Sequence, residues 1–314
     1  MEKIKGIDLC ESFYNDFGKA MIREQFPDLE NKIAFALVGS GSECLGYDDD
    51  TSCDHDFYAG FCMLVPDDID SKTEFALERA YAKLPKEYRG FKREKLDPVG
   101  GNRHGVIKIG DFLEAKTGKR NGILTEQDWF FVPEQALLEV TCGKVFCDES
   151  GVFSEIRKKL EYFPEDIRLK KLAGNLLLMA QSGQYNYQRS VKRGHSASAQ
   201  LAVFEFVRAT LNVIFLLNKR YIPYYKWVFV ALDELKILSN LHAPLEYLIS
   251  SANSPSESDK KTEIIDKICA DIIEELKNQG LTGAEHSDLD PHAYSVNNKI
   301  KSPTVRNMHI LAGV

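Results

Sequence analysis

Two aspartates separated by one residue are the strongest chemical feature of this sequence. Asp54 and Asp56 open the segment DHDFYAGFCMLV, whose apolar remainder predicts a β-strand. Because strand side chains alternate between two faces, both carboxylates would emerge on one side while His55 points to the other. Such a pair repels itself unless a cation lies between the two groups, and Mg²⁺ prefers carboxylate oxygens. We therefore expect Asp54 and Asp56 to be the catalytic, metal-binding pair.

A glycine and serine turn stands just upstream of this pair. The apolar run Ile33 to Val38 predicts a strand, and the residues GSGS follow it. Backbone N–H groups and hydroxyls in such a turn can hold an anion such as a polyphosphate. We expect Gly39, Ser40 and Ser42 to contact phosphate. A phosphate cradle beside metal-binding carboxylates predicts nucleotide chemistry.

Three other interpretations of this stretch were weighed. The glycines Gly39, Gly41 and Gly46 follow a strand, as in a dinucleotide-binding fold, but their spacing is G-x-G-x-x-x-x-G and no helical pattern begins at the third glycine. A P-loop would need a closing Gly-Lys-Ser/Thr, which is absent. In the third interpretation, the run Asp48 to Asp50 and Asp54 form an ordinary acidic loop.

At these positions the sequence resembles the DNA polymerase β-like nucleotidyltransferase superfamily. Its pattern is an apolar strand, Gly-Ser, a gap of about a dozen residues and Asp-x-Asp on the next strand, matched here by Gly39, Ser40, Asp54 and Asp56. The resemblance implies a Mg²⁺-dependent enzyme that transfers an NMP group from an NTP, with ATP expected, to a hydroxyl on a small molecule or protein and releases pyrophosphate.

A closer resemblance covers most of the chain. The strings GSGSECLGYDDDTSCDHDF, GQYNYQR and FLLNKRYIPYYKW are similar to those of a bacterial family of nucleotidyltransferase-like proteins described as a domain of unknown function. This resemblance implies the superfamily chemistry without naming a substrate.

The superfamily's third carboxylate has no clear counterpart here. It would lie on the strand predicted over Val106 to Ile109, which contains no acid. Asp111, Glu114 and Glu139 are near in sequence, and Asp111 is the preferred candidate, although each also fits a surface charge. A catalytically inactive nucleotide-binding module is therefore an open alternative to the enzyme.

Composition sets the broader class. The chain has 314 residues, 44% of them hydrophobic and 28% charged, with a net charge of −7. Such values are those of a globular protein, and a basic face for nucleic acid is not expected. The seven cysteines show no C-x-x-C pair or zinc spacing, which favours reduced thiols. No signal segment or apolar run of about 18 residues was identified, so a cytoplasmic location without membrane contact is expected; the oligomeric state is left open.

The chain is expected to form an α+β fold, with a small mixed-sheet nucleotidyltransferase domain followed by an all-helical bundle. The proposed domains are residues 1–152 and 153–314. Helical periodicity over Ile7 to Phe26 and Thr73 to Leu84 predicts two helices of the first domain, each stopped by a proline. From Ser154 onward the pattern is helical throughout, and the segment Ser251 to Asp259 is the predicted surface loop.

Two clusters in the helical half could contact a nucleotide. In QYNYQRSVKRGH, Tyr187 would stack on a base and Arg189 would meet the triphosphate; in NKRYIPYYKW, Lys226 is the expected phosphate contact. Each cluster also fits a purely structural role. Arg189 and His195 match a loose spacing seen in helical ribonuclease domains, so an RNA-cleaving domain is a lesser alternative.

Overall fold

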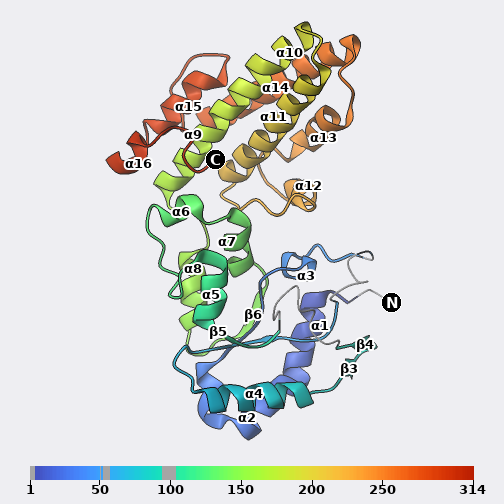
Figure 1. The fold of residues 1–314 in the computed structure, drawn as a ribbon, viewed down its shortest axis with the longest axis vertical. Coiled ribbons are helices and arrows are strands. Elements are labelled where there is room, and N and C mark those ends of the chain that lie inside the picture. Colours follow the sequence, from blue (N-terminus) through green and yellow to red (C-terminus); the bar gives the residue numbers. More distant parts are fainter. Residues whose placement is uncertain (1–3, 50, 52–56, 94–103) are drawn as a thin grey trace. The chain divides into compact units, whose positions relative to one another are not determined.

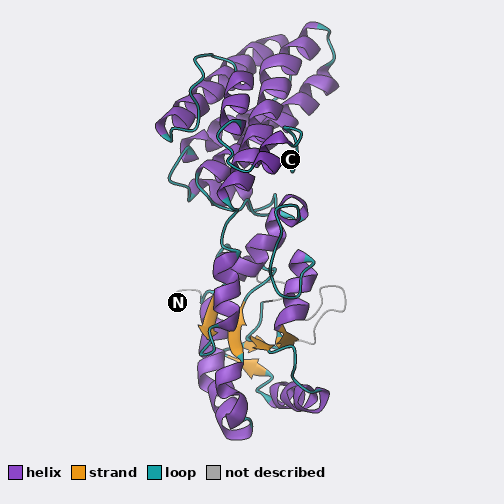
Figure 2. Ribbon diagram, turned by 90° about the vertical axis from the view of Figure 1, so that its left-hand side faces the viewer, coloured by secondary structure: helices purple, strands orange, loops and turns teal. Residues whose placement is uncertain are grey.

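The computed structural model of the chain describes residues 4–49, 51, 57–93 and 104–314 (Figure 1). The chain divides into two compact units. The N-terminal unit comprises Met1–Leu124 and Val132–Glu161, and the helical unit comprises Thr125–Phe131 and Tyr162–Val314. Figure 2 shows that the described strands belong to the N-terminal unit, so the predicted α+β class with an all-helical C-terminal part is confirmed.

A four-stranded mixed sheet forms the centre of the N-terminal unit, in the order β5-β2-β1-β6. Strand β1 pairs antiparallel with both β2 and β6, whereas β2 and β5 are parallel. Every residue of β1 and β2 is buried, as expected for central strands covered on both faces. The strands are β1 (Ala34–Leu37), β2 (Cys62–Val65), β5 (Gly105–Lys108) and β6 (Lys144–Cys147).

Helices cover the sheet on both sides (Figure 1). One face packs Phe35, Met63 and Val106 into a core with apolar residues of α1, α2 and α4. A π-helical turn over Tyr14–Gly18 joins α1 to α2 within the single helix predicted here. The helices of this unit are α1 (Gly6–Phe13), α2 (Lys19–Gln25), α3 (Ser42–Leu45), α4 (Ser71–Lys83), α5 (Ile109–Thr117), α7 (Glu134–Thr141) and α8 (Val152–Lys159).

A short hairpin follows α4. Strands β3 (Glu87–Tyr88) and β4 (Phe91–Lys92) pair antiparallel. The two residues between them, Arg89 and Gly90, both have positive φ, at 50° and 87°. This is the conformation of the tight turns that match the twist of a two-residue hairpin.

In the helical unit, α9 packs against both α11 and α15, and α14 packs against the π-helical turn Ala180–Tyr187 that follows α9. Figure 1 shows α9, α11 and α14 forming the body of the bundle. Its helices are α6 (Asp128–Phe131), α9 (Glu165–Met179), α10 (Gln188–Lys192), α11 (Ser196–Leu217), α12 (Val228–Asp233), α13 (His242–Ser250), α14 (Pro255–Asn278), α15 (Leu289–Asn297) and α16 (Pro303–Asn307).

Helix α11 is the one helix among the described residues that is long and apolar enough to cross a membrane, judged by length and composition. It is not an uninterrupted apolar run, because it contains Glu205 and Arg208. However, 61% of its most apolar window is buried within the structure, and a core helix passes the same test, so this feature is weak evidence for a membrane span.

Two local predictions need correction. The strand predicted to open at Asp54 is β2, which begins at Cys62; Phe57 to Phe61 are not in a strand. At Phe61, directly before β2, the carbonyl accepts from the Gly105 N–H of β5, but the amide donates to the Tyr81 hydroxyl, at 3.0 Å, and so makes no bond to a neighbouring strand. The predicted loop Ser251 to Asp259 ends at Ser254, because Pro255 occupies the first turn of α14, where proline's missing N–H is not needed.

Candidate active site

The Gly-Ser turn lies directly at the end of β1, where sequence analysis placed it. Gly39 and Gly41 have φ values of 103° and 135°, which side chains with a Cβ rarely adopt. The chain therefore turns sharply out of the buried strand into the short helix α3. The side chain of Ser40 is exposed and that of Ser42 is half-buried. Both serines therefore contribute to the surface of the turn.

The turn is fixed by the segment that enters β6. The Gly39 N–H donates to the Glu139 carbonyl at 3.0 Å, and the Gly143 N–H donates to the Cys44 carbonyl at 2.8 Å. The Cys142 thiol lies 3.4 Å from the Gly39 carbonyl. The Gly39 amide thus already has an acceptor within the protein, and the contribution of Gly39 seen in the structure is the backbone conformation of the turn.

Asp54 and Asp56, the predicted metal-binding pair, lie outside the described residues. The sheet does show where the chain leads into β2. Ala36 of β1 pairs with Cys62, the first residue of β2, in an antiparallel register. The segment that enters β2 therefore lies at the same end of the strands as the Gly39–Ser40 turn, which follows β1.

The loop before this segment is anchored to α1. Asp48 is buried, and its carboxylate accepts a 2.9 Å hydrogen bond from the Gly6 N–H at the start of α1. Lys5 donates to the Asp48 carbonyl at 2.9 Å. Asp48 thus has a structural role at a helix N-terminus, where negative charge is favourable.

The strand expected to carry a third carboxylate, β5, ends in Lys108. The Lys108 ammonium lies 2.9 Å from the Glu74 carboxylate of α4, and this hydrogen bond raises the pKa of Lys108. A cation thus occupies the end of the strand on which the superfamily pattern expects an acid.

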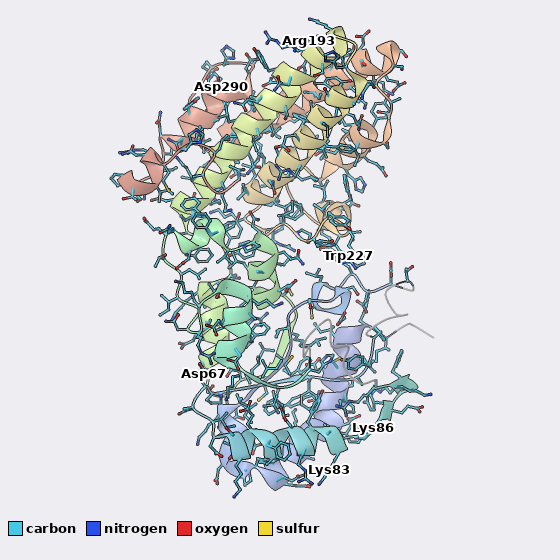
Figure 3. All side chains as sticks on the ribbon, in the orientation of Figure 1. Asp67, Lys83, Lys86, Arg193, Trp227 and Asp290 are labelled. Carbon is cyan, nitrogen blue, oxygen red and sulfur yellow. The ribbon has the colours of Figure 1, made fainter. Side chains whose placement is uncertain are left out.

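The three acids considered for the third position are each in an ion pair. Asp111 and Glu114 accept hydrogen bonds from the same guanidinium, that of Arg120, whose pKa they raise. Arg120 also lies 3.4 Å from Asp67, which Figure 3 labels at the base of α5. Glu139 accepts a hydrogen bond from Lys116. None of the three carboxylates is available without giving up a cationic partner.

A cavity of about 430 Å³ opens beside the turn. Its wall includes the two ion-paired lysines, three carboxylates and the turn itself. The lining residues are Val38, Gly39, Ser40, Cys62, Glu74, Glu78, Val106, Ile107, Lys108, Asp111, Phe112, Ala115 and Lys116. The cavity therefore brings Gly39 and Ser40 together with both ammonium groups and Asp111. The sequence did not predict these lysines and Glu74, because they come from β5, α5 and α4 and no local pattern links these three elements.

The predicted contacts in the helical unit have different environments. Tyr187 is fully buried, and its hydroxyl donates to the Asn253 side chain at 3.2 Å. Burial also raises the pKa of this phenol. The Arg189 guanidinium lies 4.0 Å from the ring centre of Tyr185, which is 54% exposed. Of the two tyrosines in this motif, Tyr185 therefore carries the exposed cation–π contact.

Lys226 lies in the turn that precedes α12. Its ammonium is 5.0 Å from the ring centre of Trp227, which Figure 3 labels. Next to it, the rings of Tyr224 and Tyr225 are 4.2 Å apart, and Tyr225 is 74% exposed. This is an exposed aromatic and cationic surface on the helical unit.

A second cavity, of about 650 Å³, lies within the helical unit and was not expected from the sequence. Its charged lining comes from α14 and from the segment before α15, and includes Asp266, Glu274, Asp288, Lys277 and His286. Desolvation, followed by the charge of Asp288, raises the pKa of Asp266. Asp266 and Glu274 both belong to α14, whereas Asp288 comes from the segment before α15. The fold therefore brings Asp288 to the two acids of the helix.

A known protein family matches part of the chain. The family DUF4037, a domain of unknown function, matches residues 129–228. This range contains the motifs GQYNYQR and FLLNKRYIPYYKW and lies outside the Gly-Ser and Asp-x-Asp motifs. No curated protein matches the sequence.

A crystal structure of a nucleotidyltransferase-like protein from Exiguobacterium sibiricum 255-15 is similar to this chain at 12% sequence identity and a TM-score of 0.36. The similarity covers 93% of this chain and 81% of that one.

Proposed function

We propose that this protein is a divalent-metal-dependent nucleotidyltransferase that transfers an NMP group from an NTP to a hydroxyl acceptor. The observation that carries this proposal is the position of the Gly39–Ser40 turn. The turn follows the buried central strand β1, and the segment leading into β2 lies at the same end of these strands. The Asp-x-Asp motif stands in the sequence just before that segment.

The donor set fits a hard divalent cation. Two carboxylates, Asp54 and Asp56, supply oxygen ligands, and substrate phosphates complete the coordination shell of a Mg²⁺ ion in many phosphoryl-transfer sites. When bound, Mg²⁺ would neutralise phosphate charge and lower the barrier to attack at the α-phosphorus. The hydroxyls of Ser40 and Ser42 would orient the phosphate tail, and the left-handed conformation of Gly39 would keep the backbone close to it.

The two ion-paired lysines of the cavity are proposed to contact the nucleotide phosphates. Lys108 and Lys116 line the cavity beside Ser40, each with a carboxylate partner. An incoming phosphate would compete with Glu74 and Glu139 for these ammonium groups. Because Glu74 and Glu139 are themselves only 27% and 14% exposed, we expect each ammonium group to be shared between its carboxylate and the phosphate, so that neither carboxylate loses its cation.

The test is nucleotide turnover by the full chain and by the variants Asp54→Asn and Asp56→Asn. Pyrophosphate release is measured with each of four NTPs and Mg²⁺ in the presence of small-molecule and protein acceptors. Either substitution is expected to lower turnover roughly 1,000-fold or more, about 4 kcal/mol of transition-state stabilisation. The control is Asp68→Asn, an exposed acid of the same unit. Near-normal turnover in either aspartate variant would contradict the proposed role.

The second candidate is a nucleotide-binding module without catalysis. It is favoured by one observation: β5 ends in Lys108, and Asp111, Glu114 and Glu139 are all in ion pairs. Saturable NTP binding without pyrophosphate release, across the same acceptors, supports this module over the enzyme.

A further inference from the structure

Two cysteine thiols lie against consecutive carbonyls of the Gly39–Ser40 turn. The Cys142 sulfur is 3.4 Å from the Gly39 carbonyl oxygen, and the Cys44 sulfur is 3.9 Å from the Ser40 carbonyl oxygen. The two residues come from distant parts of the sequence, one in α3 and one directly after α7. The fold therefore brings two thiols to the same turn.

The backbones that carry these thiols are also adjacent. The Cys44 carbonyl accepts a 2.8 Å hydrogen bond from the N–H of Gly143, the residue after Cys142. A disulfide requires Cα atoms about 4.4–6.8 Å apart, a separation compatible with two backbones joined by such a bond. Neither cysteine is in a disulfide in the structure. Bond formation requires both side chains to rotate away from the carbonyls that they contact.

The two thiols differ in exposure and in electrostatic environment. Cys44 is buried, whereas Cys142 is partly exposed. The Cys44 thiol hydrogen bond lowers the pKa of Cys142, and the nearby Arg157 guanidinium lowers it further. Arg157 is held in place by the carbonyls of Thr141 and Cys142, at 2.6 and 2.7 Å. Cys142 is thus the thiol that an oxidant reaches, and its pKa lies below the ordinary value.

We propose that Cys44 and Cys142 form a reversible disulfide when the protein meets a hydroperoxide. The Cys142 thiolate attacks one peroxide oxygen and breaks the O–O bond, which leaves a sulfenic acid on Cys142 and releases hydroxide. The Cys44 sulfur then attacks the Cys142 sulfur and displaces water as the Cys44 thiol loses its proton. In total, two thiols and one hydrogen peroxide give one disulfide and two waters, and a dithiol reductant reverses the reaction.

The disulfide would act on the turn. Both sulfurs contact its carbonyls when reduced, and a covalent S–S bond of about 2.05 Å pulls them toward each other and away from those contacts. This second step rests on the proposed function, because it takes the turn that carries Ser40 as a phosphate-binding site. Oxidation is expected to weaken nucleotide binding at least 10-fold, and reduction restores it.

The chemistry is tested without any nucleotide. The reduced full chain is treated with one equivalent of hydrogen peroxide, blocked with an alkylating reagent and digested for mass spectrometry. A peptide linking Cys44 to Cys142, removed by dithiothreitol, is expected as the main product. The control is Cys10→Ser, since Cys10 lies in the same buried cluster as Cys44 and its loss should leave the linkage intact.

The variant Cys44→Ser separates the two chemical steps. Without a resolving thiol, Cys142 is expected to remain as a sulfenic acid that dimedone traps. A linkage between other cysteines, or no loss of free thiol at one equivalent of peroxide, overturns the proposal. Nucleotide affinity is then measured on the oxidised and reduced chains. Equal affinities with a formed disulfide overturn the regulatory step alone, and absence of nucleotide binding in both forms points to failure of the proposed function.

Discussion

Gly143 is the position where the structure sets the sharpest demand on a single residue. It follows Cys142 and has a φ of 71°; a Cβ built there would lie 2.0 Å from the Leu37 carbonyl oxygen and 3.2 Å from the Val38 Cα. Both neighbours are backbone atoms of β1 and its end. Alanine at this position therefore cannot be accepted by rotation of a side chain, and the strand itself must move.

The expected cost of Gly143→Ala has two parts. The left-handed conformation costs alanine about 1–2 kcal/mol, and the clash with a packed backbone adds about 1–3 kcal/mol. The matched control is Gly151→Ala, because Gly151 also has a φ of 71° but a Cβ there meets nothing within 4 Å. Both substitutions restrict the unfolded chain equally. The difference between the two variants therefore isolates the clash with β1.

Amide hydrogen exchange followed by mass spectrometry is the suitable assay, because it reports the stability of β1 and β2 separately from the helical unit. Both tryptophans, Trp129 and Trp227, belong to the helical unit, so their fluorescence during urea unfolding serves as an internal control. We expect β1 amides to lose about 1–3 kcal/mol more protection in Gly143→Ala than in Gly151→Ala. Equal protection in the two variants, within about 0.5 kcal/mol, would refute the reasoning.

Two other changes test the site and the helical unit. Ser40→Ala is expected to weaken NTP binding about 10- to 100-fold, since a hydrogen bond to a charged group contributes about 1.5–3 kcal/mol. Calorimetric titration measures the affinity, and Ser71→Ala, at an exposed serine, is the control. Unchanged affinity in Ser40→Ala would contradict the prediction. Asp266 has a raised pKa, so the folded protein holds its proton to higher pH than the unfolded chain and stability falls as pH rises from 3.8 through the native pKa. Asp266→Asn should therefore stabilise the helical unit at pH 7 and change it little below pH 3.8, measured by tryptophan fluorescence in urea; a greater effect in acid would contradict this sign.

Local sequence signals were sufficient for most of the secondary structure. The run Ile33 to Val38 gave β1, and Pro85 ends the pattern that gave α4. The first is a continuous apolar run that ends at Gly39 and the second has a helical period that ends at Pro85, so neighbouring residues alone specify them. The Gly-Ser turn was predictable for the same reason, because two glycines directly after an apolar run are typical of a turn with positive φ angles, which Gly39 and Gly41 have.

The helical motif QYNYQR shows why the face of a residue was harder to predict. The tyrosines differ sharply, since Tyr187 is fully buried and Tyr185 is 54% exposed. The segment Ala180–Tyr187 is a π-helical turn, in which hydrogen bonds span one residue more than in an α-helix. A projection at 3.6 residues per turn therefore assigns these side chains to the wrong faces, and no local signal marked the change.

The ion pairs and thiols around the turn depend on the sheet order and not on local pattern. Strand β6 pairs with β1, so Glu139, Cys142 and Gly143 meet the residues that follow β1. These three residues lie within residues 129–228, the range that matches DUF4037, whereas the Gly-Ser motif lies outside it. The matched segment thus supplies the partners that hold the turn in its conformation. The conformation of the turn at Ser40 consequently depends on both segments. A substitution at Gly143 is therefore expected to change this conformation as directly as a substitution in the Gly-Ser motif itself.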